Sequence, residues 1–266
     1  MKPPLTYFGG KQRLASTIIP LIPKHQLYCE PFFGGGAVFF AKDPSEIEVI
    51  NDTNGELVNF YKVVKNDFND LQREIKTTLH SRQLHENARI VLQHPELFNE
   101  VKRAWAVWVL ANQSYGGRMD APWGYDRKQN TSGKRIARKR DAFTEVYAAR
   151  LKQAQIESAD ALRVIASRDS PDSFFYCDPP YFNGRPGHYK AYSERDFEAL
   201  LQVLAGVEGK FLLSSYPSDT LARYSKNQKW YSKAMEAPLA ITSRYLNRAR
   251  RKVEVLTANY QLESTV

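Results

Sequence analysis

The stretch Phe174-Phe175-Tyr176-Cys177-Asp178-Pro179-Pro180-Tyr181 carries the strongest structural signal in the chain. Its first four residues are apolar or aromatic and predict a short buried strand, which the two prolines end. The first proline biases Asp178 away from helical angles, and the second does the same to Pro179, so their carbonyls stay in an extended loop. The stretch therefore predicts a carboxylate and an aromatic ring at the end of a buried strand.

This combination suits a planar base that carries an exocyclic amino group. The lone pair of such an amine is delocalised into the ring, so the nitrogen is a poor nucleophile, and acceptors from Asp178 and the Pro179 carbonyl favour its pyramidal form. Pro180 keeps the loop extended, and Tyr181 offers a ring face on which a flipped base can stack. Aspartate and proline are also common in ordinary strand-ending turns, so the tetrapeptide alone leaves a structural role open.

A second signal lies near the amino end of the chain. Residues 27–29 predict a short buried strand, Gly34-Gly35-Gly36 a tight turn, and residues 37–41 the start of a helix. A further alternating strand ends at Asp52, 18 residues after Gly34. Nucleotide-binding α/β folds place a ribose-binding carboxylate about 20 residues beyond the glycine loop. Asp52 is therefore the predicted ribose ligand, although loop flexibility is the more frequent reason for a lone glycine cluster.

Composition and charge limit the class of protein. A chain of 266 residues with 42% apolar residues can bury a core as one large domain, or as one domain with an insertion. The net charge of +9 favours a polyanionic partner. A basic strip between residues 127 and 152 consists of Arg127, Lys128, Lys134, Arg135, Arg138, Lys139, Arg140, Arg150 and Lys152. The strip predicts phosphate contacts, with a solvated basic helix face as the alternative.

Several kinds of site and location are not expected. Cys29 and Cys177 are predicted in buried strands and are interpreted as small core residues without a disulfide. The five histidines have no ligand spacing with the cysteines, so no metal site is expected. The absence of a long apolar run and of a signal peptide predicts a cytoplasmic protein with no membrane partner. The sequence indicates no dimerisation element and no obligate protein partner, so a monomer is expected.

Taken together, these segments resemble the Dam-like (D12 class) DNA adenine-N6 methyltransferases over almost the whole chain. Residues 7–11 are similar to the family's first cofactor motif, residues 30–37 to its glycine loop, residues 51–54 to its ribose acid, and residues 178–181 to its catalytic loop. This resemblance implies a Rossmann-like S-adenosylmethionine-dependent α/β fold with a mixed, mainly parallel sheet. It also implies an inserted helical and hairpin target-recognition subdomain at residues 67–152, between catalytic segments 1–66 and 153–266.

The resemblance also assigns the cofactor and its contacts. It implies S-adenosylmethionine as the methyl donor and places Asp178 between this cofactor and the target base, with Pro179, Pro180 and Tyr181 completing the catalytic loop. Lys11 is chemically suited to pair with the cofactor carboxylate, although a lysine taken alone is more often a solvated surface residue. The predicted cofactor-binding residues are Tyr7, Lys11, Phe32, Gly34, Gly36, Asp52, Ile156 and Asp178.

Residues 114–125 resemble the recognition hairpin of the same family. By this resemblance Tyr115 fills the space that the flipped adenine leaves in the base stack, and Arg118 reads a base edge. Pro122 and Trp123 contact a groove of the DNA. The hairpin is shorter than the family's, so no recognition sequence is transferred, and a structural loop is the alternative for each residue. The predicted DNA-binding residues are Tyr115, Arg118, Pro122, Trp123, Arg127, Lys134, Arg135 and Arg138.

The function implied by the resemblance is methyl transfer to N6 of adenine in double-stranded DNA after base flipping. Cytosine N4 and adenine in RNA present a comparable amine and stay open as acceptors. A DNA-binding protein that keeps the fold without turnover is the alternative from another class.

Overall fold

The computed structural model describes residues 1–183, 192–237 and 252–262. Packing divides the chain into two compact units. The helical unit comprises residues 1–12, 34–44 and 52–158, and the sheet unit comprises residues 13–33, 45–51 and 159–266. This division follows contacts and differs from the predicted catalytic and recognition parts, because the glycine loop and Asp52 pack with the helical region. The functional division stays a prediction.

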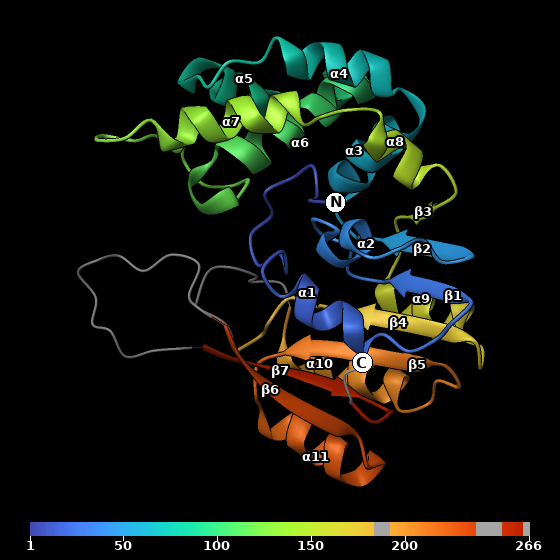
Figure 1. Ribbon diagram of the computed structural model, residues 1–266. Helices are drawn as coiled ribbons and strands as arrows, with labels where there is room; N and C mark the ends of the chain where they lie inside the picture. Colours follow the sequence, from blue (N-terminus) through green and yellow to red (C-terminus); the bar gives the residue numbers. More distant parts are fainter. Residues whose placement is uncertain (184–191, 238–251, 263–266) are drawn as a thin grey trace. The chain divides into compact units, whose positions relative to one another are not determined.

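Six strands of the sheet unit form one sheet (Figure 1). Their order is β2 (Ile47–Asn51), β1 (Leu27–Glu30), β4 (Ser173–Cys177), β5 (Lys210–Ser215), β7 (Lys252–Ala258) and β6 (Tyr231–Ala237). The first four are parallel, and β7 is antiparallel to β5 and β6. Strand β4 is buried along its whole length, which explains its uninterrupted apolar sequence. The predicted Rossmann-like α/β class with a mixed, mainly parallel sheet is confirmed.

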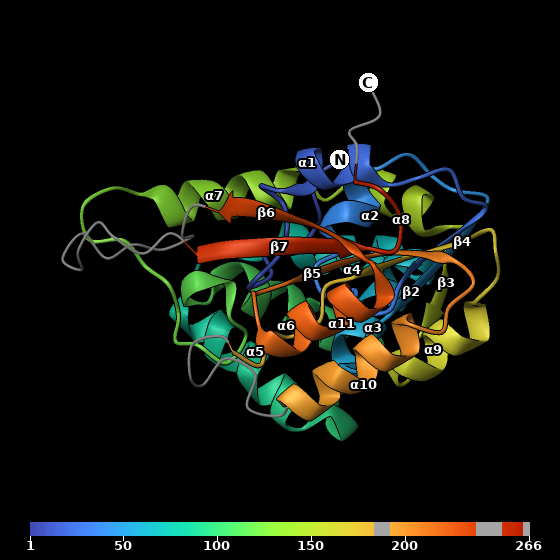
Figure 2. The same cartoon turned by 90° about the horizontal axis from the view of Figure 1, so that it is seen from below.

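Helices cover both faces of this sheet. Helices α9 (Ala161–Arg168), α10 (Glu194–Leu204) and α11 (Asp219–Gln228) lie along one face (Figure 2), where Val164, Leu201 and Leu221 pack on Phe175 and Leu213. Side chains at their N-caps accept backbone N–H groups and fix where each helix begins. The opposite face carries α1 (Ala15–Ile18) and the 3₁₀ turn η1 (Ile19–Leu21) (Figure 2).

The strand order creates one point at which a ligand site is expected. From β1 the chain moves to β2 on one side, whereas from β4 it moves to β5 on the other, so the order reverses between β1 and β4. Open α/β sheets bind ligands outside the carboxyl ends of the strands at such a switch point. The register that pairs Cys29 with Phe175 brings the residues after Glu30 and those after Cys177 to this edge.

The helical unit is built around one buried helix. It contains α2 (Ala37–Ala41), α3 (Gly55–Asn66), α4 (Phe68–Lys76), α5 (Arg82–Gln93), η2 (Pro95–Leu97), α6 (Glu100–Gln113), η3 (Tyr115–Gly117), α7 (Thr131–Asp141), α8 (Val146–Leu151) and strand β3 (Gln155–Glu157). Residues 104–113 of α6 are all buried, and α3, α4, α5 and α7 pack against it (Figure 1). Trp105 and Trp108 are thus core residues. None of the helices described here is long and apolar enough to cross a membrane.

Candidate functional site

The Asp-Pro-Pro-Tyr loop leaves β4 at the switch point of the sheet. Asp178 and Tyr181 are half-buried, and Pro179 is buried. The Tyr181 hydroxyl donates to Asp178 Oδ1 over 3.1 Å. The Tyr181 ring packs edge-on against Tyr216, with ring centroids 4.3 Å apart and planes at 63°. The phenol therefore orients the carboxylate while the ring is held against a second aromatic residue.

Ser214 completes this arrangement from the neighbouring strand. Its Oγ lies 2.9 Å from the Tyr181 hydroxyl oxygen, and the residue has no exposed surface. Sequence reasoning missed Ser214, because a serine near the end of an apolar strand carries no special pattern. Ser214 can be recognised as a site residue only once the strand register is known. Cys177 pairs with Leu213, so the residues that follow them, Asp178 and Ser214, lie side by side.

A second group of buried polar residues lies on β1 and β4. The Tyr28 hydroxyl donates to Glu30 Oε1 over 2.6 Å, and both residues are almost fully buried. The Tyr176 hydroxyl is also buried and has no hydrogen-bond partner among the described residues. Burial, and next the nearby Asp178 carboxylate, raise the pKa of Tyr176 well above its usual value. This phenol therefore stays protonated and can act as a donor.

Asn51 forms hydrogen bonds to two loops of the sheet unit, one at Pro31 and one at Ala159. Its buried amide donates to the carbonyls of Pro31, over 2.9 Å, and Ala159, over 3.0 Å, and accepts from the Ala159 N–H over 2.9 Å. Phe32, a predicted cofactor contact, follows Pro31 and packs its ring against the core under α9 and α10. The position of Phe32 is thus set by an amide at the end of β2.

The glycine loop and Asp52 meet in the helical unit. The Gly34 N–H donates to Asp52 Oδ2 over 2.9 Å, and the Asn54 N–H donates to Oδ1 over 2.9 Å. Gly34 (φ +49°) and Gly36 (φ +65°) occupy the left-handed region, which favours glycine. Burial raises the pKa of Asp52, and the N–H groups of Asn54 and Gly34 oppose that rise. Each carboxylate oxygen keeps a second lone pair for a hydroxyl donor.

Tyr7 is packed directly against this glycine loop. A Cβ atom on Gly35 would lie 2.7 Å from Tyr7 Cβ, and one on Gly34 would lie 3.1 Å from Tyr7 Cε1. Tyr7 also begins a turn, in which the Gly10 N–H donates to the Tyr7 carbonyl over 3.1 Å. The loop needs glycine here because the tyrosine already fills the space.

Lys11 and Ile156 lie in the same unit. Lys11 is only 5% exposed, and its Nζ donates to the Gly9 carbonyl over 3.3 Å. Ile156 is half-buried on β3, and the nearby Ser158 hydroxyl donates to the Asp52 carbonyl over 3.3 Å. The helical unit thus contains five predicted cofactor residues besides Ile156, namely Tyr7, Lys11, Gly34, Gly36 and Asp52.

The predicted recognition hairpin is closed by backbone hydrogen bonds. The Tyr115 N–H donates to the Pro122 carbonyl, and the Gly124 N–H donates to the Gln113 carbonyl, both over 2.8 Å. Tyr115 is 61% exposed, as a base-contacting residue requires. Arg118 instead forms an ion pair with Asp120, whose Oδ2 lies 2.7 Å from Nη2. Asp120 thus occupies the Nε–Nη2 edge of Arg118, which is one of the edges that could read a base.

Buried Gln113 connects the hairpin to the segment between α4 and α5. Its amide donates to the Leu79 carbonyl over 2.9 Å, and its Oε1 accepts from the Ser81 N–H at 3.2 Å and from Trp123 Nε1 at 3.4 Å. The Trp123 ring stacks on Tyr125, with centroids 5.5 Å apart. Trp123 is therefore a fixed part of the hairpin. Sequence reasoning missed Gln113 because its partners come from a separate loop.

The basic strip is divided between surface and structural residues. Arg127, Lys134 and Arg138 are exposed, as expected of phosphate contacts. Arg135 is half-buried, and its Nη2 donates to the Asn112 carbonyl over 3.4 Å. Lys139, Arg140 and Arg150 likewise donate to backbone carbonyls. Charge counting overstates the available positive surface, because several of these cations satisfy carbonyl groups within the unit.

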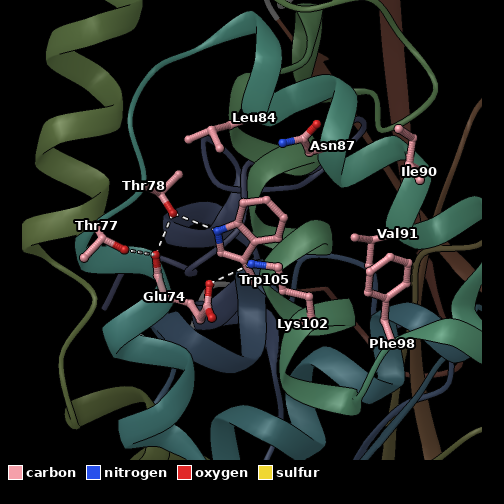
Figure 3. Close-up of a pocket in the computed structure, with 10 residues that line it drawn as sticks. All are labelled: Glu74, Thr77, Thr78, Leu84, Asn87, Ile90, Val91, Phe98, Lys102 and Trp105. Carbon is pink, nitrogen blue, oxygen red and sulfur yellow. Dashed lines mark hydrogen bonds and ion pairs between the residues drawn. The ribbon is translucent and has the colours of Figure 1, made fainter.

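A pocket of about 410 Å³ lies elsewhere in the helical unit, among α4, α5 and α6 (Figure 3). Trp105 forms one wall, and Lys102 Nζ lies 4.0 Å from its ring centroid and 2.9 Å from Glu74 Oε2. The lining residues include no predicted site residue. This pocket is therefore separate from the candidate site.

The mixed sheet, the glycine loop anchored by Asp52 and the Asp-Pro-Pro-Tyr loop define the class of Rossmann-like methyltransferases. A family model described as D12 class N6 adenine-specific DNA methyltransferase matches residues 7–245. The chain belongs to this family, and the predicted resemblance is confirmed.

Individual relatives agree with the family. The type II methyltransferase M1.LlaDCHI of Lactococcus lactis subsp. cremoris is 26% identical over 196 residues, and the match covers 68% of this chain and 66% of that protein, slightly under two thirds of its length. The DNA adenine methylase of Salmonella typhi is 25% identical over 270 residues, covering 97% of this chain and 94% of that one. A solved rRNA methyltransferase, aviRa from Streptomyces viridochromogenes, has a TM-score of 0.35 at 11% identity, and the match covers 92% of this chain and 83% of that chain.

Proposed function

We propose that this protein transfers the methyl group of S-adenosylmethionine to N6 of adenine in double-stranded DNA after base flipping. Family membership supports this reaction, and so do relatives named DNA adenine methylase. The observation that carries the proposal is the Asp178 carboxylate, held by the Tyr181 hydroxyl at the switch point of the sheet. It is the type of acceptor that an adenine amine requires.

The helical unit has the chemistry to hold the proposed cofactor. S-adenosylmethionine presents a ribose diol, which needs acceptors, and a carboxylate, which needs a cation. Asp52 offers lone pairs on both oxygens beside the Gly34 N–H, and Lys11 offers an ammonium group. Gly34 and Gly36, with positive φ, and Tyr7, packed on the loop, shape a backbone that can approach a nucleoside closely. Phe32 and Ile156 are the proposed apolar contacts.

The protein's own residues position and polarise the acceptor. When bound, the cofactor supplies a sulfonium methyl group that moves to N6, with the S–C electron pair staying on sulfur. Asp178 and the Pro179 carbonyl accept the N6–H groups, which keeps the nitrogen lone pair directed out of the ring plane. Pro180 holds the loop extended, and Tyr181 stacks on the flipped base. As the new N–C bond forms, the methylated nitrogen loses one proton to water, which leaves the neutral product amine.

The hairpin and the exposed part of the basic strip form the proposed DNA-binding surface. Tyr115 is exposed and suited to fill the space left by the flipped base, while Pro122 and Trp123 lie at the base of the same hairpin. Phosphate contacts are assigned to Arg127, Lys134 and Arg138, and Arg118 reads a base edge. Arg135 is a further proposed DNA contact, and its Nη2 also donates to the Asn112 carbonyl.

The test is product identification. The protein is incubated with methyl-labelled S-adenosylmethionine and unmethylated mixed-sequence duplex DNA, and the DNA is digested to nucleosides. Label in N6-methyl-deoxyadenosine is the expected result. Label in N4-methyl-deoxycytidine, or in RNA adenine only, would replace the proposed acceptor. Binding of DNA and cofactor without transfer would leave a silent DNA-binding protein.

The carboxylate is tested by Asp178→Ala. Removal of a group that polarises the reacting atom lowers transfer by about 100-fold or more, while DNA binding is retained. Asp172→Ala is the matched control, because Asp172 is an exposed carboxylate that precedes β4 at its opposite end. Activity of Asp178→Ala within about tenfold of the wild type would remove Asp178 from the reaction, since tenfold corresponds to only about 1.4 kcal/mol.

A further inference from the structure

Two hydrogen bonds link strand β5 to the catalytic loop. The Tyr181 hydroxyl donates to Asp178 Oδ1 over 3.1 Å, and Ser214 Oγ lies 2.9 Å from the same hydroxyl oxygen. Ser214 has no exposed surface. The contacts therefore form a chain from the serine through the phenol to the carboxylate.

The direction of this chain follows from its chemistry. A tyrosine hydroxyl has one hydrogen, and an ionised carboxylate can only accept. Because the Tyr181 hydrogen points to Asp178, Ser214 must donate its own hydrogen to the Tyr181 oxygen. A phenol that accepts one hydrogen bond becomes a better donor of the next, since hydrogen bonds in a chain polarise one another.

The neighbouring serine shows that this contact is specific to one position. Side chains alternate along a strand, so Ser214 and Ser215 point to opposite faces of β5. Ser215 is also buried, at 3% exposure, but its hydroxyl has no hydrogen-bond partner in the part of the chain that the structure describes. The two serines thus have similar burial and different contacts.

The Tyr181 hydroxyl also fixes the ring that it belongs to. The ring is bonded at its hydroxyl end by Ser214 and Asp178 and packs edge-on against Tyr216 at 4.3 Å. A χ1 change that swings the hydroxyl away would break both hydrogen bonds, whereas the packing on Tyr216 limits rotation about the Cβ–Cγ axis. The hydroxyl thus links the position of the Tyr181 ring to that of the Asp178 carboxylate.

We infer that Ser214 is a positioning residue for methyl transfer, acting through the Tyr181 hydroxyl to fix both the Asp178 carboxylate and the Tyr181 ring. This inference rests on the proposed function for its effect on catalysis. Ser214 itself does not contact the reacting atoms; it holds the two groups that do. Hydrogen bonds within the protein that hold reacting groups in place contribute to the preorganisation of a site.

The experiment combines variants that separate the hydroxyl chain from general folding. Tyr181→Phe keeps the ring and removes the hydroxyl, Ser214→Ala removes its donor, and the double variant removes both. Ser215→Ala is the control, since it removes a buried hydroxyl one residue away that has no partner. Methyl transfer at saturating cofactor and DNA gives kcat, and KM for each is measured separately.

The expected results follow from the strength of each bond. Tyr181→Phe lowers kcat about 10- to 100-fold, as for a hydrogen bond to a charged group, and Ser214→Ala lowers it about 2- to 10-fold, as for a neutral pair. The cofactor KM stays within about twofold. The double variant matches Tyr181→Phe within about twofold, because coupled residues are not additive. Ser215→Ala stays within about twofold of the wild type.

Two outcomes would overturn the inference. One is that Ser214→Ala lowers kcat by the same factor in the wild type and in the Tyr181→Phe background, because that would show a general structural role. The other is an equal loss in Ser214→Ala and Ser215→Ala.

A readout that does not depend on methyl transfer separates this inference from the proposed function. With ¹³C at tyrosine Cζ, the Tyr181 resonance is assigned by its loss in Tyr181→Phe. Ser214→Ala is expected to shift that resonance, whereas Ser215→Ala leaves it in place. If the variants show these shifts but the wild-type protein transfers no methyl group, the proposed function is contradicted and the hydrogen-bond chain is still supported. An unshifted resonance would contradict the chain itself.

Discussion

Gly35→Ala is expected to destabilise the helical unit through one contact. The new Cβ would lie 2.7 Å from Tyr7 Cβ, whereas carbon atoms normally approach to about 3.5–4.0 Å. Both atoms are attached directly to the backbone, so no rotamer change separates them, and the loop must move by about 1 Å to restore that contact distance. Overpacking of this kind costs about 1–3 kcal/mol.

The matched control is Gly55→Ala. Gly55 is the first residue of α3 and belongs to the same unit, and a Cβ there meets nothing within 4 Å. Alanine restricts the unfolded chain and favours helix, so this variant is expected to be neutral or more stable by up to about 1 kcal/mol. Chemical denaturation of both variants gives the free energies of unfolding, and cofactor titration shows whether the displaced loop also binds more weakly.

A double-mutant cycle identifies the atom responsible. Tyr7→Ala keeps the Cβ atom that causes the clash, whereas Tyr7→Gly removes it. Gly35→Ala should therefore lose most of its cost in a Tyr7→Gly background, giving a coupling energy of about 1–3 kcal/mol, and keep it in a Tyr7→Ala background. Equal relief in both backgrounds, or a Gly35→Ala variant as stable as Gly55→Ala, would refute this reasoning.

Two further predictions concern buried polar groups of the helical unit. Gln113→Leu leaves the Leu79 carbonyl and the Ser81 N–H without their partner and should lower the free energy of unfolding by about 2–4 kcal/mol; a denaturation midpoint equal to the wild type would contradict this. Burial, followed by Arg135 and Lys2, lowers the pKa of Lys139 from 10.5 to about 8. The unfolded chain then binds more protons than the folded one between these values, so stability rises from pH 8 to 10.5, and Lys139→Met should remove that rise in melting measurements. The same slope in both proteins would rule out Lys139 as its source.

Features with a local sequence pattern were predictable. The apolar run before Asp178, the glycine cluster and the acid at Asp52 each depend on neighbouring residues, and the structure confirms the strands and joins Gly34 to Asp52. The mixed, mainly parallel sheet follows from the same patterns and the family resemblance. Whether Asp52 binds ribose stays a prediction.

Features that depend on strand register or on distant loops were not predictable. Ser214 matters because β5 lies beside β4 in one register, and Gln113 because the segment after α4 returns to the hairpin. Positive charge was misleading for a related reason. Arg135 and Lys139 look like surface cations in the sequence, but their distant carbonyl partners exist only in the folded unit.

The closure of the recognition hairpin separates its attachment points from its exposed residues. The Tyr115–Pro122 and Gln113–Gly124 backbone bonds hold the two ends in place without using the side chains between them. Residues added or removed in that interval would alter the reach of the loop while its attachment points stay fixed. Changes of length are best placed between the buried residues Gly117 and Ala121, where they would leave the packing of the hairpin on its unit in place.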